Sequence, residues 1–324
     1  MDLSNITIEK DLQIVFMGTP EFAVPVLEGL IENYNVRAVV SQPDKAKDRN
    51  GCIIKTPIKR VAEEHTILVL QPENIKEEYQ EILDLRPDLI VTCAYGQIIP
   101  KELLECPRLG CINVHASLLP RLRGGAPIHR AIMNGFKKTG ITIMYMNSKM
   151  DEGDIISQRE VEITDTDTAS SLHDKLQIVG KELLLDTLPS IINGTNERIK
   201  QDTSKVSYAF NIRPEDERIN FSKSEKEIYN LVRGLNSFPG AYCLFEGKRL
   251  KVWECYMSDN HFSCFDGQIT NIYKDGFGVK VSNGEIVFTV VQPEGKRKMS
   301  AIDFINGLPN KNELIGKILD WKKK

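Results

Sequence analysis

The sequence predicts an α/β fold: a Rossmann-like domain with an open, mostly parallel sheet, followed by a small all-β domain of the OB-like barrel type. In the first half, continuous apolar runs alternate with amphipathic segments, which is typical of buried parallel strands covered by helices. After residue 208, short β-rich runs are separated by the turn signals EGK, KDG and SNG. With 324 residues, 41% hydrophobic and 27% charged, the chain has the length of two globular domains.

Strand and helix alternate along the first domain. Residues 12–18 (LQIVFMG) are expected to form a buried strand that turns at Gly18, Thr19 and Pro20 into a helix over residues 20–34. The same alternation predicts strands at 35–42, 65–71, 88–96 and 111–117, and helices at 57–65, at 74–87 and from 126 onward.

A long helix is expected to close this domain. Residues 168–192 start at a Ser/Thr-rich cap and carry apolar residues at helical spacing. Residues 194–207 are polar and show no period, so they are interpreted as a linker. The expected domains are therefore 1–193 and 208–324, and a helix within 222–240 opens the second one.

Composition excludes several classes of protein. No apolar run approaches the roughly 20 residues of a membrane span, and the opening MDLSNITIEKDLQ is too polar for a signal peptide, so we expect a cytoplasmic protein. The seven cysteines contain no C-x-x-C pair, which argues against a disulfide framework and a zinc ribbon. We expect them to be buried as small hydrophobic side chains.

A row of polar side chains marks the end of one predicted strand. Asn113, His115 and Ser117 are alternate residues, so they are expected to share one face of the sheet. Open parallel sheets bind ligands at the carboxyl ends of their strands. Because a buried Asn or His needs a hydrogen-bond partner, the row serves either the core or a ligand, and the local pattern leaves both open.

The usual nucleotide and metal motifs are missing. The first strand ends in a single glycine, without G-x-G-x-x-G, and no phosphate-binding G-x-x-x-x-G-K-[ST] occurs, so we expect neither NAD nor ATP in the usual mode. No H-x-x-x-H or H-E-x-x-H spacing occurs, so no metal is expected. Ser117 lacks a surrounding G-x-S-x-G turn, which disfavours a covalent nucleophile.

A carboxylate downstream completes a candidate constellation. Asp151 lies in a Gly-flanked turn of TGITIMYMNSKMDEGDII, a place where carboxylates often only form the turn. If the strand order brings Asp151 beside Asn113 and His115, an amide, an imidazole and a carboxylate converge. This set suits transfer of an acyl group to an amine, because donors hold the developing oxyanion while a base removes a proton.

At these residues the sequence resembles the formyltransferases that use 10-formyltetrahydrofolate. NVHASLLPRLRGGAPIHRAIMNG and TGITIMYMNSKMDEGDII match that family's Asn-x-His, Ser-Leu-Leu-Pro and downstream Asp. Further segments are similar to the methionyl-tRNA formyltransferase family, and they cover nearly the whole chain: IVFMGTPEFAVPVLEGL, SQPDK, AYGQIIP, VRGLNSFPGAY, GKRLKVWE and QPEGKRKMSAIDFINGL.

The resemblance implies specific roles. Asn113 and His115 are expected to polarise the formyl carbonyl and stabilise its oxyanion, and Asp151 to set the protonation of the imidazole and assist proton removal from the methionyl amine. 10-Formyltetrahydrofolate is the expected formyl donor and initiator methionyl-tRNA the acceptor, with no metal, membrane or obligate protein partner. The residues expected to line the folate site are Ser117, Leu118, Leu119, Pro120, Ala94, Tyr95, Gly96, Gln97 and Ile98.

The resemblance also implies contacts to tRNA. The residues expected to make them are Arg49, Lys45 and Lys47 in the loop after SQPDK, and Lys248, Arg249, Lys296, Arg297 and Lys298 in the second domain. That loop reads AKDRNGCIIK where the family is richer in Gly, Arg and Lys, and Phe210 and Asn211 stand where the family usually has Pro and Lys. Residues 208–324 contain 18 Lys and Arg against 15 Asp and Glu, a balance that permits a polyanionic partner without demanding one.

Two other functions remain open at this point. A formyltransferase acting on an amino sugar nucleotide shares the catalytic residues but does not need the second domain's QPEGKRKMSAIDF segment. A noncatalytic RNA-binding protein on the same scaffold is a second alternative, against which the intact Asn113, His115 and Asp151 speak.

Overall fold

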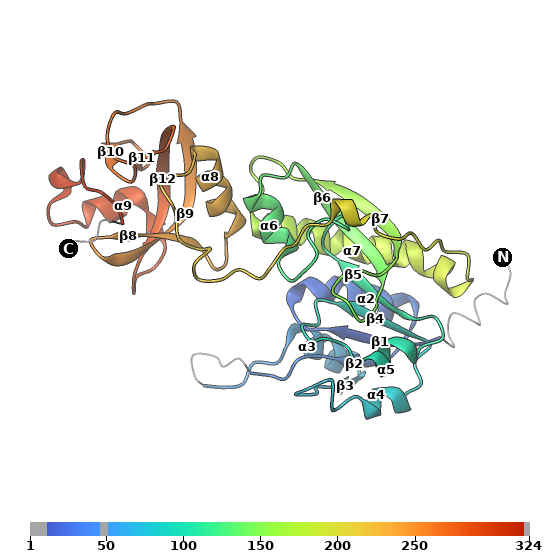
Figure 1. Cartoon of the computed structure of the whole chain (residues 1–324). Helices are drawn as coiled ribbons and strands as arrows, with labels where there is room; N and C mark the ends of the chain where they lie inside the picture. Colours follow the sequence, from blue (N-terminus) through green and yellow to red (C-terminus); the bar gives the residue numbers. More distant parts are fainter. Residues whose placement is uncertain (1–11, 46–50, 321–324) are drawn as a thin grey trace. The chain divides into compact units, whose positions relative to one another are not determined.

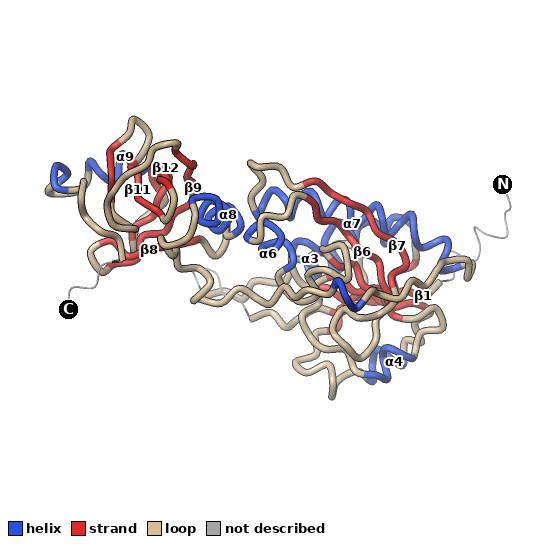
Figure 2. Tube along the Cα trace, turned by 45° about the horizontal axis from the view of Figure 1, so that its top comes forward, coloured by secondary structure: helices blue, strands red, loops and turns tan. Residues whose placement is uncertain are grey.

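The computed structural model describes residues 12–45 and 51–320, and the chain divides into two compact units (Figure 1). Unit 1 contains the described residues up to Pro127 together with 138–162 and 173–210. Unit 2 contains 128–137, 163–172 and the described residues from Asn211. The segment expected to be a linker, 194–207, thus belongs to unit 1, where its structure is mainly loop (Figure 2).

Unit 1 is built on a seven-stranded sheet in the order β3-β2-β1-β4-β5-β6-β7. The first five strands in this order pair in parallel, whereas β6 is antiparallel to β5 and β7 to β6. The strands are β1 (Gln13–Gly18), β2 (Asn35–Val40), β3 (Leu68–Leu70), β4 (Leu89–Cys93), β5 (Cys111–His115), β6 (Lys138–Tyr145) and β7 (Ile155–Glu162).

Helices and short helical turns lie between or after these strands in sequence, and residues 128–137 and 163–172 among them belong to unit 2. They are η1 (Glu21–Ala23), α2 (Val24–Asn33), α3 (Pro57–Glu64), α4 (Gln80–Asp84), α5 (Lys101–Glu105), α6 (Pro127–Met133), α7 (Ala169–Ile192) and η2 (Thr203–Lys205). Ile82 of α4 and Leu103 of α5 share a core with Val15 and Met17 of β1. Among the described residues, no helix is long and apolar enough to span a membrane.

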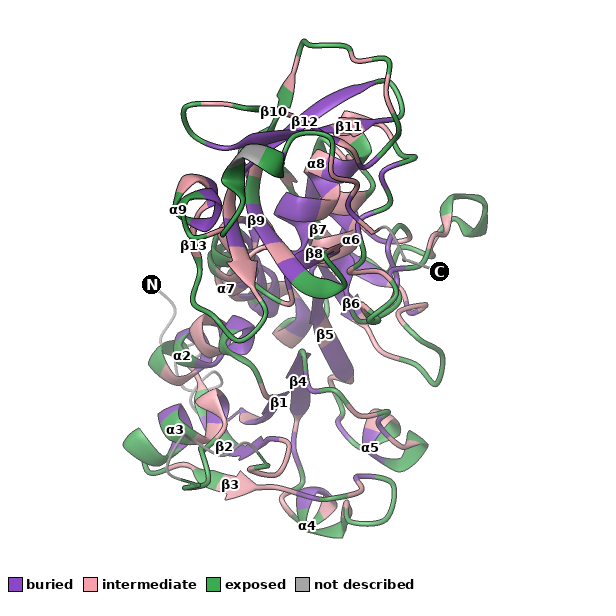
Figure 3. Ribbon diagram, turned by 90° about the vertical axis from the view of Figure 1, so that its left-hand side faces the viewer, coloured by how far each residue is buried: buried purple, intermediate pink, exposed green. Residues whose placement is uncertain are grey.

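The strands at the centre of this sheet are buried almost throughout, as Figure 3 shows for β4 and β5. Burial on both faces explains why their sequences read as continuous apolar runs. Gly18 ends β1 where only a glycine fits, because a Cβ there would lie 2.9 Å from the Cys93 backbone oxygen. The ends of β1 and β4 can therefore lie close together.

Unit 2 contains an all-antiparallel sheet in the order β10-β11-β12-β9-β8, with β13 paired to β12. Its turns fall at the EGK, KDG and SNG signals, and the predicted two-part fold class is confirmed. The elements are α8 (Glu225–Gly234), β8 (Ala241–Phe245), β9 (Lys248–Ser258), β10 (Ile269–Ile272), β11 (Phe277–Val281), β12 (Gly284–Pro293), β13 (Met299–Ser300), α9 (Ala301–Asn306) and η3 (Lys311–Glu313).

Some sequence expectations differ from the structure. The helix expected over 74–87 is reduced to α4, and β5 ends at His115, so Ser117 lies beyond the strand. The expectation that all cysteines are buried is wrong, since Cys52 and Cys106 are exposed. Cys93, Cys111 and Cys243 are buried, and burial raises the pKa of each thiol.

Candidate active site

The candidate site lies at the carboxyl end of β5, where the sheet changes direction. β5 pairs in parallel with β4 through Thr92 and Asn113, and antiparallel with β6 through His115 and Thr142. Because β6 runs antiparallel to β5, the hairpin between β6 and β7 starts opposite Ile112, near the beginning of β5. Asp151 of this hairpin is joined to the other end of β5 by contacts with His115 and with Gly124 in the loop that follows the strand. These contacts bring His115 and Asp151 together, and Asn113 lies two residues before His115 on the same strand.

Asn113 is held in one orientation by its neighbour on β4. The hydroxyl of Thr92, itself only 3% exposed, donates to Asn113 Oδ1 over 2.8 Å. Since this bond occupies the amide oxygen, the Nδ2 amino group is the part of Asn113 that can donate to a ligand.

His115 is buried and bonded through one ring nitrogen. Its Nε2 lies 3.1 Å from the backbone oxygen of Leu122, and because a carbonyl only accepts, Nε2 carries a proton. The other nitrogen, Nδ1, lies 3.8 Å from Asp151 Oδ1. This separation is longer than a hydrogen bond, and catalytic contacts of this kind commonly tighten when substrate binds.

Asp151 is fixed by the geometry of its turn. Its φ of 49° lies in the left-handed region, and its Oδ2 accepts the backbone N–H of Gly124 over 2.7 Å. Two residues later, a Cβ on Gly153 would lie 1.8 Å from the Tyr145 oxygen, so only glycine lets the hairpin close this tightly. The carboxylate is therefore directed at His115 by the backbone on both sides of it.

Two residues that the sequence analysis did not predict brace this turn. Gln201 donates its Nε2 to the backbone oxygens of Asp151 (2.8 Å) and Gly153 (2.9 Å). Its Oε1 accepts from Arg123 Nε (3.0 Å) and NH2 (2.8 Å). Arg123 is only 3% exposed and lies 3.5 Å from Glu152, whose pKa is lowered by Lys149. No sequence pattern marks Gln201, since it stands in a polar segment without a period.

The Ser117-Leu-Leu-Pro120 segment forms a tight turn directly after β5. The Ser117 hydroxyl donates to the backbone oxygen of Arg121 over 2.7 Å, so it stabilises the turn. Thr142 of β6 donates to the Ser117 oxygen (2.6 Å) and accepts from Leu119 N (3.1 Å). Leu118 and Pro120 are half-buried, whereas Leu119 is buried.

The second expected folate segment, residues 94–98, follows β4. Ala94, Gly96 and Ile98 are exposed, and the first two have positive φ values of 50° and 91°. The backbone oxygen of Tyr95 accepts from Thr19 Oγ1 (3.0 Å) and Gln42 Nε2 (3.2 Å), which fixes the loop. Tyr95 itself is buried, and this burial raises its pKa to about 12.

The basic residues expected to contact tRNA are exposed wherever they are described. Lys45 forms a surface ion pair with Glu73 over 3.1 Å, while Lys47 and Arg49 lie outside the described residues. Lys248 and Arg249 begin β9, and the Arg249 guanidinium lies 4.0 Å from the Tyr242 ring centre. Lys296, Arg297 and Lys298 form the turn after β12, close to β9.

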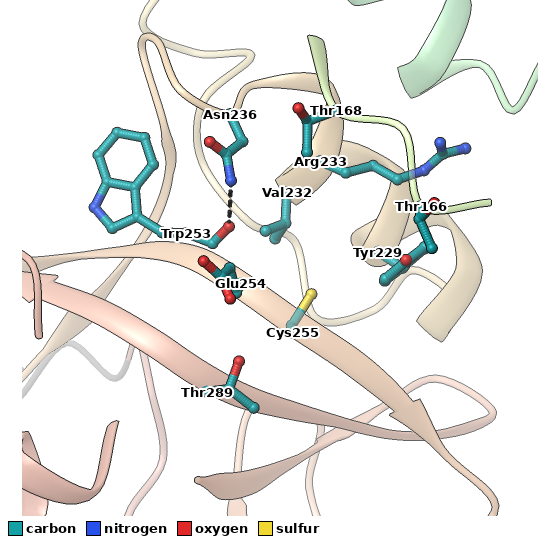
Figure 4. Close-up of a pocket in the computed structure, with 10 residues that line it drawn as sticks. All are labelled: Thr166, Thr168, Tyr229, Val232, Arg233, Asn236, Trp253, Glu254, Cys255 and Thr289. Carbon is teal, nitrogen blue, oxygen red and sulfur yellow. Dashed lines mark hydrogen bonds between the residues drawn. The ribbon is translucent and has the colours of Figure 1, made fainter. Parts of the chain in front are cut away.

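A separate pocket of about 290 Å³ lies in unit 2 (Figure 4). Thr166 and Thr168, α8 and the strands β9 and β12 contribute its lining, which includes the buried Arg233. Arg233 is committed to the fold, since its NH1 donates to the backbone oxygens of Thr164 (3.1 Å) and Asp167 (2.9 Å). In the described part of the chain, no group of three or more His, Cys, Asp or Glu side chains is placed to hold a metal ion.

Comparison with known proteins identifies the family. Residues 12–188 match the formyl transferase family, and residues 211–309 match the C-terminal domain of formyl transferases. The methionyl-tRNA formyltransferase of Bacillus velezensis is 50% identical over 311 residues, covering 95% of this chain and 97% of the relative. That of Bacillus subtilis is 49% identical over 299 residues, covering 91% and 94%.

Solved structures show the same fold at lower identity. WlaRD, a sugar 3N-formyl transferase solved in the presence of dTDP and 5-N-formyl-THF, has a TM-score of 0.65 at 20% identity, covering 88% of this chain and 99% of that one. The N-formyltransferase from Helicobacter canadensis, in complex with folinic acid and dTDP-3-aminofucose, has a TM-score of 0.67 at 22% identity, covering 86% and 99%.

The resemblance expected from the sequence motifs is thus confirmed over both parts of the chain. The two family matches cover most of its length, and about half of the positions are identical to those of bacterial relatives. The chain therefore belongs to the formyl transferase family, of which it contains both the N-terminal and the C-terminal domain.

Proposed function

We propose that this chain transfers the formyl group of 10-formyltetrahydrofolate to the α-amino group of initiator methionyl-tRNA. The observation that carries the proposal is identity of 49–52% to bacterial methionyl-tRNA formyltransferases over 91–95% of the chain. The matched region includes the C-terminal domain. A substrate as large as tRNA can contact this domain in addition to the catalytic domain. The enzyme is proposed to act in the cytoplasm, where translation begins.

Asn113 is proposed to stabilise the charge that develops on the formyl oxygen. Thr92 donates to the amide oxygen of Asn113, so Nδ2 of Asn113 is the group that donates to the formyl oxygen in the transition state. A donor fixed in advance needs no reorganisation during the reaction, which is the basis of oxyanion stabilisation.

His115 and Asp151 are proposed to handle the proton released by the attacking amine. With Nε2 bonded to Leu122, Nδ1 is the ring atom that can exchange a proton. Asp151 stands beside Nδ1 and stabilises the positive charge of the imidazolium when it forms. Positioning of the amine against the formyl carbon is proposed to supply much of the remaining acceleration, because orienting two reactants can lower the activation free energy by about 7 to 11 kcal/mol.

The residues present fit a reduced pterin cosubstrate, which supplies the formyl group when bound. Residues 94–98 expose backbone groups at two positive-φ positions, which suit the alternating donors and acceptors of a pterin ring. Ile98, which is 69% exposed, adds an apolar residue to this loop. We propose that this loop and residues 117–120 line the folate site, and that no metal takes part.

A formyl-transfer assay tests the proposal directly. Purified protein and 10-formyltetrahydrofolate are incubated with charged initiator methionyl-tRNA, charged elongator methionyl-tRNA, or an amino sugar nucleotide. We expect rapid formylation of the initiator species alone. Formylation of the sugar instead would retain the chemistry and reject the acceptor, while no transfer to any acceptor would favour an RNA-binding protein without activity.

A further inference from the structure

An exposed pair of aromatic rings lies in the segment that follows α7. Tyr208 and Phe210 are 51% and 59% exposed, and their rings stack with centroids 5.5 Å apart and planes 7° from parallel. Ala209 between them is completely buried. Because successive residues of an extended chain face opposite sides, Tyr208 and Phe210 share the side that points away from the core, opposite to buried Ala209.

This arrangement differs from the other aromatic contacts of the described residues. The other ring pairs are tilted or edge-to-face, and those among phenylalanines lie within the core of unit 2 or against it. Large apolar groups gathered at a surface mark interaction sites. Tyr208 and Phe210 therefore need an explanation outside the core.

The pair is held rigidly to the loop that follows β5. Arg123 donates its backbone N–H to the Ser207 oxygen (2.9 Å), and Ala209 donates to the Arg123 oxygen (2.7 Å). Ala126 donates to the Ala209 oxygen over 3.0 Å. Tyr208 thus pairs with Arg123 as a short parallel bridge.

The same loop contacts two of the three candidate catalytic side chains, His115 and Asp151. Leu122, the residue before Arg123, bonds His115 through its backbone oxygen, and Gly124, the residue after it, donates to Asp151. Arg123, which pairs with Tyr208, therefore lies between the two residues whose backbones bond His115 and Asp151. The rings are thus anchored, through the backbone, to the loop that contacts His115 and Asp151.

We propose that Tyr208 and Phe210 form a stacking platform for the terminal adenine of the aminoacylated tRNA. The amino acid of any aminoacyl-tRNA is esterified to the ribose of that adenosine, so its base is the first nucleobase beyond the reacting amine. Aromatic side chains bind bases through their faces, and two parallel rings extend naturally into a stack of three. This inference rests on the proposed function and adds a contact that orients the ester.

The test is a double-mutant cycle in which the two rings of the protein and the terminal base of the tRNA are removed separately and together. Initiator methionyl-tRNA with an intact terminal adenosine is compared with the same tRNA, chemically acylated, whose terminal nucleotide lacks its base. For the unsubstituted chain, loss of the base is expected to lower kcat/KM by between about 5-fold and 100-fold, the range that base stacking on aromatic side chains explains. In a Tyr208→Leu, Phe210→Leu double variant the two substrates are expected to react equally.

Two controls separate stacking from general apolar surface. Tyr208→Phe with Phe210→Trp keeps both rings and should retain the preference for the intact tRNA. Phe265→Leu removes a ring that is 73% exposed in unit 2, and it should behave as the unsubstituted chain does. The KM for 10-formyltetrahydrofolate should be the same in all four proteins, which excludes a damaged fold.

The outcomes distinguish the platform from the proposed function. If the unsubstituted chain does not formylate intact methionyl-tRNA, the proposed function is rejected and the platform with it. If it formylates both tRNAs equally well, or if the double leucine variant still prefers the intact one by the same factor, only the platform is rejected.

Discussion

At the scale of single residues, the site depends on which atom of each side chain is already occupied. Thr92 takes the oxygen of Asn113, and Leu122 takes Nε2 of His115. What remains for chemistry is one amide donor and one ring nitrogen facing a carboxylate. The fold thus selects one orientation of each group before any substrate binds.

Replacing His115 with Ala is expected to lower kcat by at least about 100-fold, because proton transfer by a positioned side chain contributes roughly 100- to 10,000-fold. Asp151→Asn should also lower kcat, since it removes the charge beside Nδ1. Circular dichroism should show both variants folded. Asp154→Asn is the matched control, because Asp154 lies on the same turn and pairs with Arg198 over 3.3 Å. Normal turnover by the His115 variant would reject the assignment.

Residues whose role follows a repeating pattern could be predicted from the sequence. Asn113 and His115 stand out as polar groups at alternate positions of an apolar strand, and Asp151 as a carboxylate in a Gly-flanked turn. The role of Asp151 beside His115 was implied by the resemblance. Thr92 and Gln201 could not be predicted, since a threonine in a strand and a glutamine in a polar segment acquire meaning only from neighbours distant in sequence. The roles proposed for Lys47 and Arg49 stay predictions.

At the scale of elements, the segment after α7 acts as a brace on the hairpin that carries Asp151. Besides Gln201, Ile199 exchanges backbone hydrogen bonds with Ile155 at the start of β7, at 2.8 and 2.9 Å. This polar, aperiodic stretch carries the short helix η2 and an isolated bridge to β7, so it is more than a connecting segment. Its hydrogen bonds, which sequence cannot show, give it a structural role.

Gln201→Glu is the variant that tests this brace. Glutamate keeps an acceptor for Arg123 but cannot donate to the backbone oxygens of Asp151 and Gly153. We expect kcat to fall by between about 10-fold and 100-fold, because a shift of a catalytic group by roughly 1 Å can lower the rate by this much. The KM for the folate should stay unchanged. Steady-state kinetics well below the unfolding temperature provide the measurement. A lowered Tm with normal kcat would show that Gln201 supports only stability.

The start of α8 makes a prediction that depends on pH. Ser224 and Glu227 form a reciprocal capping box, and the Ser224 backbone N–H, the Ser224 hydroxyl and Lys223 lower the pKa of Glu227 to about 2. The charged carboxylate therefore contributes stability above its ordinary pKa of about 4.3, and this is lost as the pH falls towards 2. Glu227→Ala should cost about 0.5 to 1 kcal/mol at pH 7, since its side chain is 54% exposed and screened by solvent.

Thermal unfolding at several pH values measures this effect. The difference in Tm between the unsubstituted chain and Glu227→Ala should narrow steadily from pH 5 to pH 3. Glu215→Ala, which changes an exposed glutamate outside any helix, provides the control. A Tm difference that is independent of pH would contradict a role for the charged carboxylate.

Element prediction succeeded where periodicity was strong and failed where local signals compete. The central strands were placed within a few residues because they are buried on both faces. Helix α4 is shorter than predicted, although residues 74–87 carry helix-favouring side chains. Strand β7 was not predicted: its residues from Ser157 to Glu162 are partly or fully exposed and mostly polar, as on many edge strands.

At the scale of the whole molecule, sequence order and compactness divide the chain differently. Segments 128–137 and 163–172 precede the end of α7 in sequence, yet they belong to unit 2. A segment is assigned to a unit by its contacts with segments that are distant in sequence, and composition does not reveal such contacts. The functional boundaries expected at residues 193 and 208 stay predictions.

The basic residues after β12, Lys296 to Lys298, allow a test of tRNA binding by the full-length chain. Lys296→Ala with Arg297→Ala should weaken binding of initiator tRNA and reduce the slope of log K against log salt by roughly 0.7 to 0.9 for each phosphate that the variant no longer neutralises. Titrations between 50 and 200 mM salt, roughly the range over which such ionic interactions weaken strongly, provide the measurement. Lys101→Ala, at an exposed position of α5 in unit 1, should leave the slope unchanged.

The uneven burial of the cysteines makes the chain suited to site-directed fluorescent labelling at a native cysteine. Cys93, Cys111 and Cys243 are buried and have raised pKa values, so a maleimide dye at neutral pH should attach first at the exposed Cys52. Cys106 is also exposed, but partial burial raises the pKa of its thiol, so it should react second. Cys52 follows closely on the segment that carries Lys47 and Arg49. With Cys106 replaced by serine, a single native position would report whether tRNA reaches this loop.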